Sequence, residues 1–276
     1  MATPRIVALD VDGTIVHPPG SVAWAIASSP LPSDRVLRAV QALEAVGVGV
    51  ILASGRMFPG TRQVHEHLGL RSPLVCQQGC AVHAPAGTLL HEFPLALDVA
   101  HDVVAFARAL GHPYEWFTPQ RYLVSARNAA SDAYAAVSGV AVEYGAEPET
   151  QGLLPTGVGI ISSVEAAPGI HAELVHRLGE RVHVIDFPSV TVCVSPGVTK
   201  GRALALLCAD LGIARDEVVA VGDSVNDAPM LEWAGRGYTV THGDRYAHAA
   251  ADHVLDTTES DGVADLLERI AAGKPL

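Results

Sequence analysis

The chain of 276 residues is predicted to adopt an α/β fold, in which a parallel-sheet domain is interrupted by an inserted α+β domain. Apolar strand patterns alternate with helical patterns before residue 80 and again after residue 199. This alternation is typical of strands that pair in parallel through right-handed helical crossovers. The segment between them carries hairpin signals and isolated helices, which are typical of an antiparallel sheet. We therefore assign residues 1–82 and 191–276 to the first domain and residues 83–190 to the insert.

The first half of the parallel domain reads as three strands separated by two helices. Ser33 is a favourable N-cap residue, apolar side chains follow it at helical spacing, and Gly47 suits the left-handed position that ends a helix. Strands as apolar as these are covered on both faces of their sheet. The expected strands are 6–9, 48–53 and 74–76, and the expected helices are 34–46 and 59–68.

The pattern changes in the insert and then returns to regular alternation. Pro85-Ala86-Gly87 and Thr118-Pro119-Gln120 are turn sequences between apolar runs, and each predicts a hairpin. From Thr199 onward, helical and strand patterns alternate again. Further helices are expected at 98–110, 169–179, 199–211, 226–234 and 262–271, and further strands at 157–163, 182–186, 189–195, 218–221 and 237–240.

The composition limits the classes of function. Hydrophobic residues make up 49% of the chain, and the formal net charge of −12 without a Lys/Arg-rich run argues against nucleic acid as a partner. No apolar stretch of about 18 residues and no leader pattern occurs, so we expect a cytoplasmic protein without a membrane partner. The cysteines lack the spacing of a zinc site and are interpreted as reduced, mostly buried thiols. They are Cys76, Cys80, Cys193 and Cys208.

Four short polar stretches fall where predicted strands end or a helix begins. They read DVDGT at 10–14, ASGR at 53–56, VTKG at 198–201 and GDSVND at 222–227. In an open parallel sheet, ligands bind outside the carboxyl ends of the strands, so stretches far apart in the sequence can meet there. We expect the four stretches to form one site.

The residue types in these stretches are those of a metal and phosphate site. Unpaired buried carboxylates are costly, so the aspartates require neutralisation, and all-oxygen ligands suit Mg²⁺. Hydroxyl groups, glycine N–H groups and a lysine at a helix N-terminus can hold an anion beside the metal. The aspartates are Asp10, Asp12, Asp223 and Asp227, and the candidates for holding the anion are Gly13, Thr14, Ser54, Gly55 and Lys200.

Together, the four stretches resemble the signature motifs of the haloacid dehalogenase superfamily. The resemblance is best to its Cof-like phosphatases, which carry a large insert between the second and third motifs, and it spans most of the chain. It implies a Rossmann-like core with an inserted cap domain, and a Mg²⁺-dependent phosphatase that acts on a small phosphorylated metabolite. It also implies that Asp10 is the nucleophile that forms an aspartyl-phosphate and that Asp12 is the general acid and base.

The resemblance implies roles for the other motif residues as well. Ser54 would hold a phosphoryl oxygen, Lys200 would bridge phosphate and nucleophile, and Asp227 would reach the metal directly or through water. For Arg56 a structural ion pair is the alternative to a phosphate contact, and Asn226 could instead assist the metal or make only a hydrogen bond. The predicted metal set is Asp10, Asp12, Asp223 and Asp227, with Asp12 implied to reach the metal through its backbone carbonyl. The predicted phosphate-binding set is Gly13, Thr14, Ser54, Gly55, Arg56 and Asn226.

Lysine is rare in this chain, which contains only Lys200 and Lys274 against sixteen arginines. A compact ammonium fits between a carboxylate and a phosphoryl oxygen, whereas a planar guanidinium is too wide and donates in a fixed fork. We therefore expect the loss of Lys200 to reduce turnover while leaving folding little affected.

One departure from the family pattern lies after the third strand. Members often carry Asn-Gly there, and this chain reads Gln77-Gln78-Gly79. Asparagine tolerates a left-handed conformation better than glutamine does, so Gly79 is expected to adopt it.

Other interpretations remain open. A sugar phosphomutase shares this type of cap, and a non-catalytic binding module could use the same scaffold. A nucleotide-sugar DxD site is a further alternative for Asp10 and Asp12. An EF-hand loop is disfavoured because Ile15 and Ser21 occupy the positions where it requires Gly and Glu.

Overall fold

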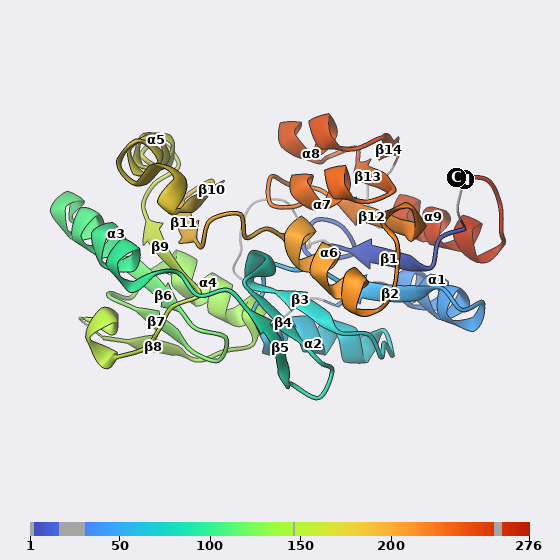
Figure 1. Ribbon diagram of the computed structural model, residues 1–276, viewed down its shortest axis with the longest axis horizontal. Coiled ribbons are helices and arrows are strands. Elements are labelled where there is room, and N and C mark those ends of the chain that lie inside the picture. Colours follow the sequence, from blue (N-terminus) through green and yellow to red (C-terminus); the bar gives the residue numbers. More distant parts are fainter. Residues whose placement is uncertain (1–2, 17–30, 146, 257–260) are drawn as a thin grey trace. The chain divides into compact units, whose positions relative to one another are not determined.

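The computed structural model describes residues 3–16, 31–145, 147–256 and 261–276 (Figure 1), and they divide into two compact units. The core unit holds the described residues up to Leu90 and from Thr199 onward, and the insert unit is His91–Val198. The division therefore falls later in the chain than the predicted boundaries after residues 82 and 190. The reason is strand pairing, since the hairpin after residue 80 pairs within the core unit and the strand near residue 190 pairs within the insert.

The core unit is built on a five-stranded parallel sheet with the order β14-β13-β12-β1-β2. A separate three-stranded sheet, β3-β4-β5, lies beside it, and one parallel bridge, from Ala53 to Val75, links the end of β2 to β3. The parallel pairing expected for the third strand is thus limited to one residue pair. The strands are β1 Ile6–Leu9, β2 Gly49–Leu52, β3 Leu74–Cys76, β4 Ala81–His83, β5 Leu89–Glu92, β12 Val218–Gly222, β13 Arg236–Val240 and β14 His253–Leu255.

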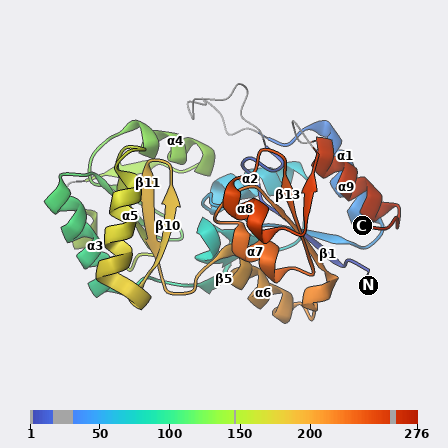
Figure 2. The ribbon, with the colours of Figure 1, turned by 90° about the horizontal axis from the view of Figure 1, so that it is seen from above.

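Helices cover both faces of the parallel sheet (Figures 1 and 2). One apolar cluster joins α1, α2 and α9 to alternate side chains of the strands, and a second joins α6, α7 and α8 to the opposite side chains. The helices are α1 Asp34–Ala45, α2 Phe58–His67, α6 Lys200–Asp210, α7 Ala228–Trp233, α8 Arg245–Ala250 and α9 Asp261–Ala271. Their packing explains the near-continuous apolar character of β1 and β12, whose residues are all buried.

The insert unit contains a six-stranded sheet with the order β10-β11-β9-β6-β7-β8, which is antiparallel except for the β7–β8 pair. Helices α3 and α5 pack against one face of this sheet and enclose its apolar core. The strands are β6 Tyr114–Phe117, β7 Tyr122–Val124, β8 Val142–Tyr144, β9 Gly157–Ile161, β10 His183–Phe187 and β11 Val190–Val194, and the helices are α3 Leu97–Leu110, α4 Ala129–Ser138 and α5 Ala167–Leu178.

Most expected elements are present, with ends displaced by one or two residues. Four elements were not expected, namely α4, β8, α8 and β14. Helix α4 reads AASDAYAAVS and lacks the stripe of large apolar residues that reveals an amphipathic helix. The other three span six residues or fewer, too few for a periodic pattern to emerge. Short 3₁₀ turns occupy Gln77–Gly79, Pro148–Gln151, Gly179–Arg181 and Arg215–Glu217.

Candidate active site

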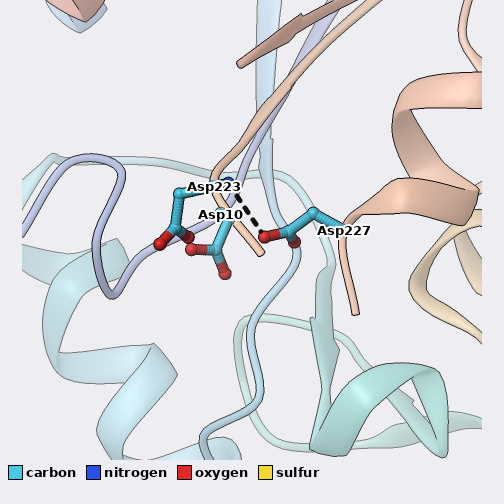
Figure 3. Close-up of side chains that lie close together, drawn as sticks. All are labelled: Asp10, Asp223 and Asp227. Atoms are coloured by element: carbon cyan, nitrogen blue, oxygen red, sulfur yellow. Dashed lines mark hydrogen bonds between the residues drawn. The ribbon is translucent and has the colours of Figure 1, made fainter. Parts of the chain in front are cut away.

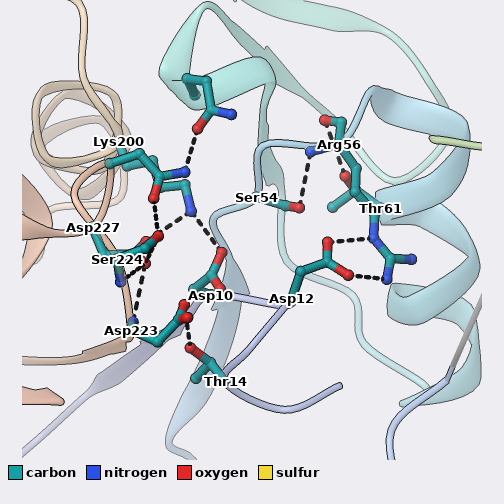
Figure 4. Close-up of polar contacts among 12 residues, drawn as sticks. Asp10, Asp12, Thr14, Ser54, Arg56, Thr61, Lys200, Asp223, Ser224 and Asp227 are labelled. Atoms are coloured by element: carbon teal, nitrogen blue, oxygen red, sulfur yellow. Dashed lines mark hydrogen bonds and ion pairs between the residues drawn. The ribbon is translucent and has the colours of Figure 1, made fainter. Parts of the chain in front are cut away.

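The predicted site residues of the core unit converge where its strands end (Figure 4). Asp10 directly follows β1, and its backbone N–H donates to the carbonyl of Val221 in β12 at 3.0 Å. Asp223 directly follows β12, and Ser54 lies two residues beyond β2. Lys200 is the first residue of α6, whose N-cap Thr199 accepts a backbone hydrogen bond. Parallel pairing thus brings three of the sequence motifs together, and the start of α6 supplies the fourth.

Three carboxylates form an acidic triad (Figure 3). Asp10, Asp223 and Asp227 each offer one oxygen, and these oxygens all lie within 4.8 Å of one another. The loop that carries two of them folds on itself, because one carboxylate oxygen of Asp227 accepts from the N–H groups of Asp223 and Ser224, both at 3.1 Å. Gly222 permits this close approach, since a Cβ there would lie 2.4 Å from the Cβ of Asp227. The triad is therefore formed by the backbone path as well as by side chains.

Lys200 is the cation of the triad. Its ammonium group donates to Asp10 at 2.6 Å and to Asp227 at 2.7 Å, and its side chain is only 1% exposed. Burial by itself lowers the pKa of Lys200, but the attraction of the two carboxylates outweighs burial and raises the pKa above its ordinary value. Lys200 is consequently charged at every physiological pH.

One lysine does not neutralise three carboxylates, of which Asp10 and Asp227 are buried and Asp223 is partly buried. Burial, together with repulsion from Asp227, raises the pKa of Asp10 from its ordinary 3.8 to about 7, although Lys200 acts in the opposite direction. Burial and the charges of Asp10 and Asp227 also raise the pKa of Asp223. Such a cluster favours a further cation, and its oxygen-only donors suit a hard divalent ion. The residues present thus fit a metal ion.

Asp12 lies outside the acidic triad and faces Arg56 instead. The guanidinium donates to both oxygens of the Asp12 carboxylate, from Nε at 2.7 Å and from a terminal nitrogen at 2.6 Å. Arg56 is 1% exposed on its side chain, whereas Asp12 is 25% exposed. Of the two roles considered for Arg56, the ion pair is the one that this geometry displays.

The hydroxyl side chains of the predicted phosphate set have identifiable partners. Ser54 is fully buried, and its hydroxyl accepts from the N–H of Arg56 at 3.1 Å. Thr14 donates to the carboxylate of Asp223 at 3.4 Å. Gly13 adopts a φ of +90°, and a Cβ there would lie 2.2 Å from a carboxylate oxygen of Asp223. Thr14 and Gly13 therefore both contact the acidic triad.

Two residues that support the site were not singled out from the sequence. The carboxylate of Asp244 accepts from the N–H of Val225 at 2.7 Å, and its own N–H donates to the carbonyl of Asp223 at 2.7 Å. A ring nitrogen of His242 lies 2.7 Å from the carbonyl oxygen of Gly13. The available signal was an aspartate in a position to cap α8, since Asp244 is the N-cap of that helix.

The cysteines and the apolar character of the helices were also considered in the sequence. All four cysteines are buried and unpaired in disulfides. Among the described residues, none of the helices combines the length and apolar character needed to cross a bilayer.

Comparison with known proteins identifies the family. A family model described as haloacid dehalogenase-like hydrolase matches residues 7–267. The chain belongs to this family. It is 25% identical to phosphatase YwpJ of Bacillus subtilis, over 96% of this chain and 99% of that protein. It is 26% identical to the 5-amino-6-(5-phospho-D-ribitylamino)uracil phosphatase YitU of the same organism, over 96% of this chain and 97% of that protein.

A solved structure supports the fold independently. The crystal structure of a haloacid dehalogenase-like hydrolase from Bacteroides thetaiotaomicron matches this chain with a TM-score of 0.82 at 23% sequence identity, over 97% of this chain and 99% of that one. The predicted fold class is confirmed by this likeness. The predicted family and enzyme class, a haloacid dehalogenase-type phosphatase, are confirmed by the family match and the relatives.

Proposed function

We propose that this protein is a cytoplasmic, Mg²⁺-dependent phosphatase that hydrolyses a small phosphorylated metabolite through an aspartyl-phosphate on Asp10. The observation that carries the proposal is the placement of Lys200, whose ammonium joins Asp10 to the rest of the acidic triad. A nucleophilic carboxylate beside a buried cation and two further carboxylates is suited to phosphoryl transfer, which needs charge neutralised at both the attacking group and the phosphate.

In the first step, Asp10 attacks phosphorus and the alcohol leaves. Asp10 must be ionised to attack, and its raised pKa shows that Lys200 alone does not secure this at neutral pH. The carboxylates of Asp10 and Asp223 and the backbone carbonyl of Asp12 would hold Mg²⁺, with Asp227 direct or through water. The bound ion would supply positive charge that favours the ionised nucleophile and the phosphoryl oxygens. Both oxygens of Asp227 already accept hydrogen bonds, which favours the water-mediated arrangement.

Asp12 moves the protons of both steps. In its protonated form it gives a proton to the leaving oxygen, and in its ionised form it takes one from the water that attacks the aspartyl-phosphate. The bidentate contact with Arg56 fixes the orientation of the Asp12 carboxylate. Arg56 is thus assigned to Asp12 rather than to the phosphate.

We assign the phosphate group of the substrate to residues 54–56, which we call the phosphate loop. The hydroxyl of Ser54 and the N–H of Gly55 are the proposed donors, with Lys200 on the opposite side. The insert unit is proposed to act as the cap that selects the substrate and excludes water. A small metabolite is favoured because the relative YitU is named for a phosphorylated small molecule.

The test is a phosphate-release screen over a metabolite panel, with and without Mg²⁺. We expect release with Mg²⁺, loss with a chelator, and loss in Asp10→Asn. Asp12→Asn should still trap beryllium fluoride but turn over poorly. Asp216→Asn, an exposed aspartate of the core unit, is the matched control and should behave as wild type.

Three outcomes would contradict the proposal. Full activity in chelator would show that the reaction needs no metal ion. Substantial activity in Asp10→Asn would show that Asp10 is not the nucleophile. Isomer formation without free phosphate would instead identify a phosphomutase, and no Mg²⁺-dependent reaction with any substrate would favour a binding module.

A further inference from the structure

The turn after β3 has an unusual backbone. Gln77, Gln78 and Gly79 have φ values of 49°, 60° and 100°, and the two glutamines are the only non-glycine residues with positive φ in the described part of the chain. The sequence predicted this conformation for Gly79 alone. Left-handed conformations of larger residues cost about 1–3 kcal/mol each and persist where the surroundings require them. The contacts of this turn show what requires it.

The backbone of the turn is attached to the phosphate loop and to the start of α6. The N–H of Gln77 donates to the carbonyl of Arg56 at 2.9 Å, and the N–H of Gln78 donates to the carbonyl of Ser54 at 3.2 Å. A Cβ on Gly79 would lie 2.3 Å from the carbonyl oxygen of Thr199, next to the Lys200 helix start. The turn therefore contacts two of the catalytic motifs at once.

The side chain of Gln78 contacts a further motif, the stretch 222–227, at Asn226. Its Oε1 accepts from the Nδ2 of Asn226 at 2.5 Å, and its Nε2 lies over Gly55, 2.3 Å from where a Cβ would stand. The Oδ1 of Asn226 in turn accepts from the hydroxyl of Ser224 at 2.5 Å, and that hydroxyl lies 3.3 Å from Asp227. The N–H of Ser224 also donates to Asp227 at 3.1 Å, so Asn226 and Ser224 connect Gln78 to the acidic triad.

We propose that Gln78 is a positioning residue that holds the metal-binding loop 223–227 against the phosphate loop through Asn226. The inference rests on the Mg²⁺ site proposed above. Only a side chain with an acceptor at this length makes the bond to Asn226, which gives a reason for glutamine in a conformation that glycine would adopt without strain. Groups that orient metal ligands typically change metal affinity about 10–100-fold when removed.

The test compares Gln78→Met with Gln78→Glu. Methionine keeps the length but cannot accept the bond, whereas glutamate keeps an acceptor oxygen. Mg²⁺ binding to the metal-free protein is measured by titration calorimetry and by the rise in melting temperature on adding Mg²⁺. We expect Gln78→Met to weaken binding at least 10-fold and Gln78→Glu to stay within about 3-fold of wild type. Gln41→Met, at an exposed position of α1, is the control and should not differ.

A second variant breaks the same bond from the other side. Asn226→Ala should weaken Mg²⁺ binding at least as much as Gln78→Met does, because it also removes the bond from Ser224. The double variant should lose little more than Asn226→Ala alone, because both changes remove the bond between Gln78 and Asn226. If Gln78→Met fails to fold, Asn226→Ala tests the same bond. Wild-type Mg²⁺ affinity in Gln78→Met, or in Asn226→Ala, or equal losses in Gln78→Met and Gln78→Glu, would overturn the inference. Absence of Mg²⁺ binding by the wild-type protein would instead overturn the metal site itself.

Discussion

Replacing Lys200 by methionine should destabilise the metal-free protein, and more so at higher pH. Methionine has a similar length but no charge, so the change leaves the buried carboxylates of Asp10 and Asp227 without their shared cation. Removing one partner of a buried ion pair costs about 3–5 kcal/mol of unfolding free energy. In a unit of this size, each kcal/mol lowers the melting temperature by roughly 2–4 °C, so a decrease of about 10 °C is expected at pH 8.

The pH dependence follows from Asp10 rather than from Lys200. The raised pKa of Asp10, about 7 against 3.8, means that the folded state holds its proton more tightly than the unfolded state. Folded stability therefore falls as the pH rises from about 4 through 7, and the whole effect corresponds to about 4 kcal/mol. Without Lys200 the pKa of Asp10 rises further, so the loss continues above pH 7. At pH 5.5 Asp10 is protonated and the ammonium matters less.

The assay is thermal unfolding in chelator at pH 5.5 and pH 8. The control is Lys274→Met, which removes the only other lysine, an exposed residue near the C-terminus. We expect Lys200→Met to melt below the control at both pH values, with the larger difference at pH 8. Equal melting temperatures for the two variants at pH 8, or a larger difference at pH 5.5, would refute the electrostatic account of Lys200.

Three further predictions follow from named contacts. Lys200→Arg should lower kcat by roughly 10²–10³, because a guanidinium does not fit between two carboxylates. A near-normal kcat would show that Lys200 contributes only its positive charge and no specific bridging contact. Arg56→Lys should lower kcat more than it raises KM, since it disturbs Asp12 and not the phosphate; a change in KM alone would contradict that assignment. Glu115→Gln should reduce the fall in melting temperature between pH 5 and pH 8. Burial raises the pKa of Glu115 to about 7, although the hydrogen bond from Tyr122 acts in the opposite direction. An unchanged pH dependence of the melting temperature would show that Glu115 does not contribute to it.

Much of the core unit could be predicted from the sequence for a simple reason. Each strand and each long helix carries its own periodic pattern, so helix α1 and strand β1 are visible without knowledge of their neighbours. The site could be predicted for a related reason, because residues at the carboxyl ends of parallel strands meet whatever the loops do. Asp10 and Asp223, which directly follow paired strands, lie together as expected.

The contact partners of individual side chains could be predicted from the sequence less well. The sequence left Arg56 open between a structural ion pair and a phosphate contact, and the carboxylate of Asp12, just beyond the end of β1 at Leu9, faces it. Spacing along a strand says nothing about direction once the strand has ended. Asn226 was given several roles, and its contact with Gln78 joins positions separated by 148 residues, which no local pattern contains.

The sequence by itself determined the fold class, the order of the motifs and the chemical character of the site, because strand and helix periodicity and strand-end geometry are local properties. Only the tertiary structure decided how charge is distributed within that site. From the sequence, Lys200 was expected to be a catalytic group whose loss leaves folding little affected. Its burial between two carboxylates instead predicts that its loss destabilises the metal-free protein. Burial and pairing depend on what surrounds a residue in space, and that environment comes from segments that the local pattern does not include.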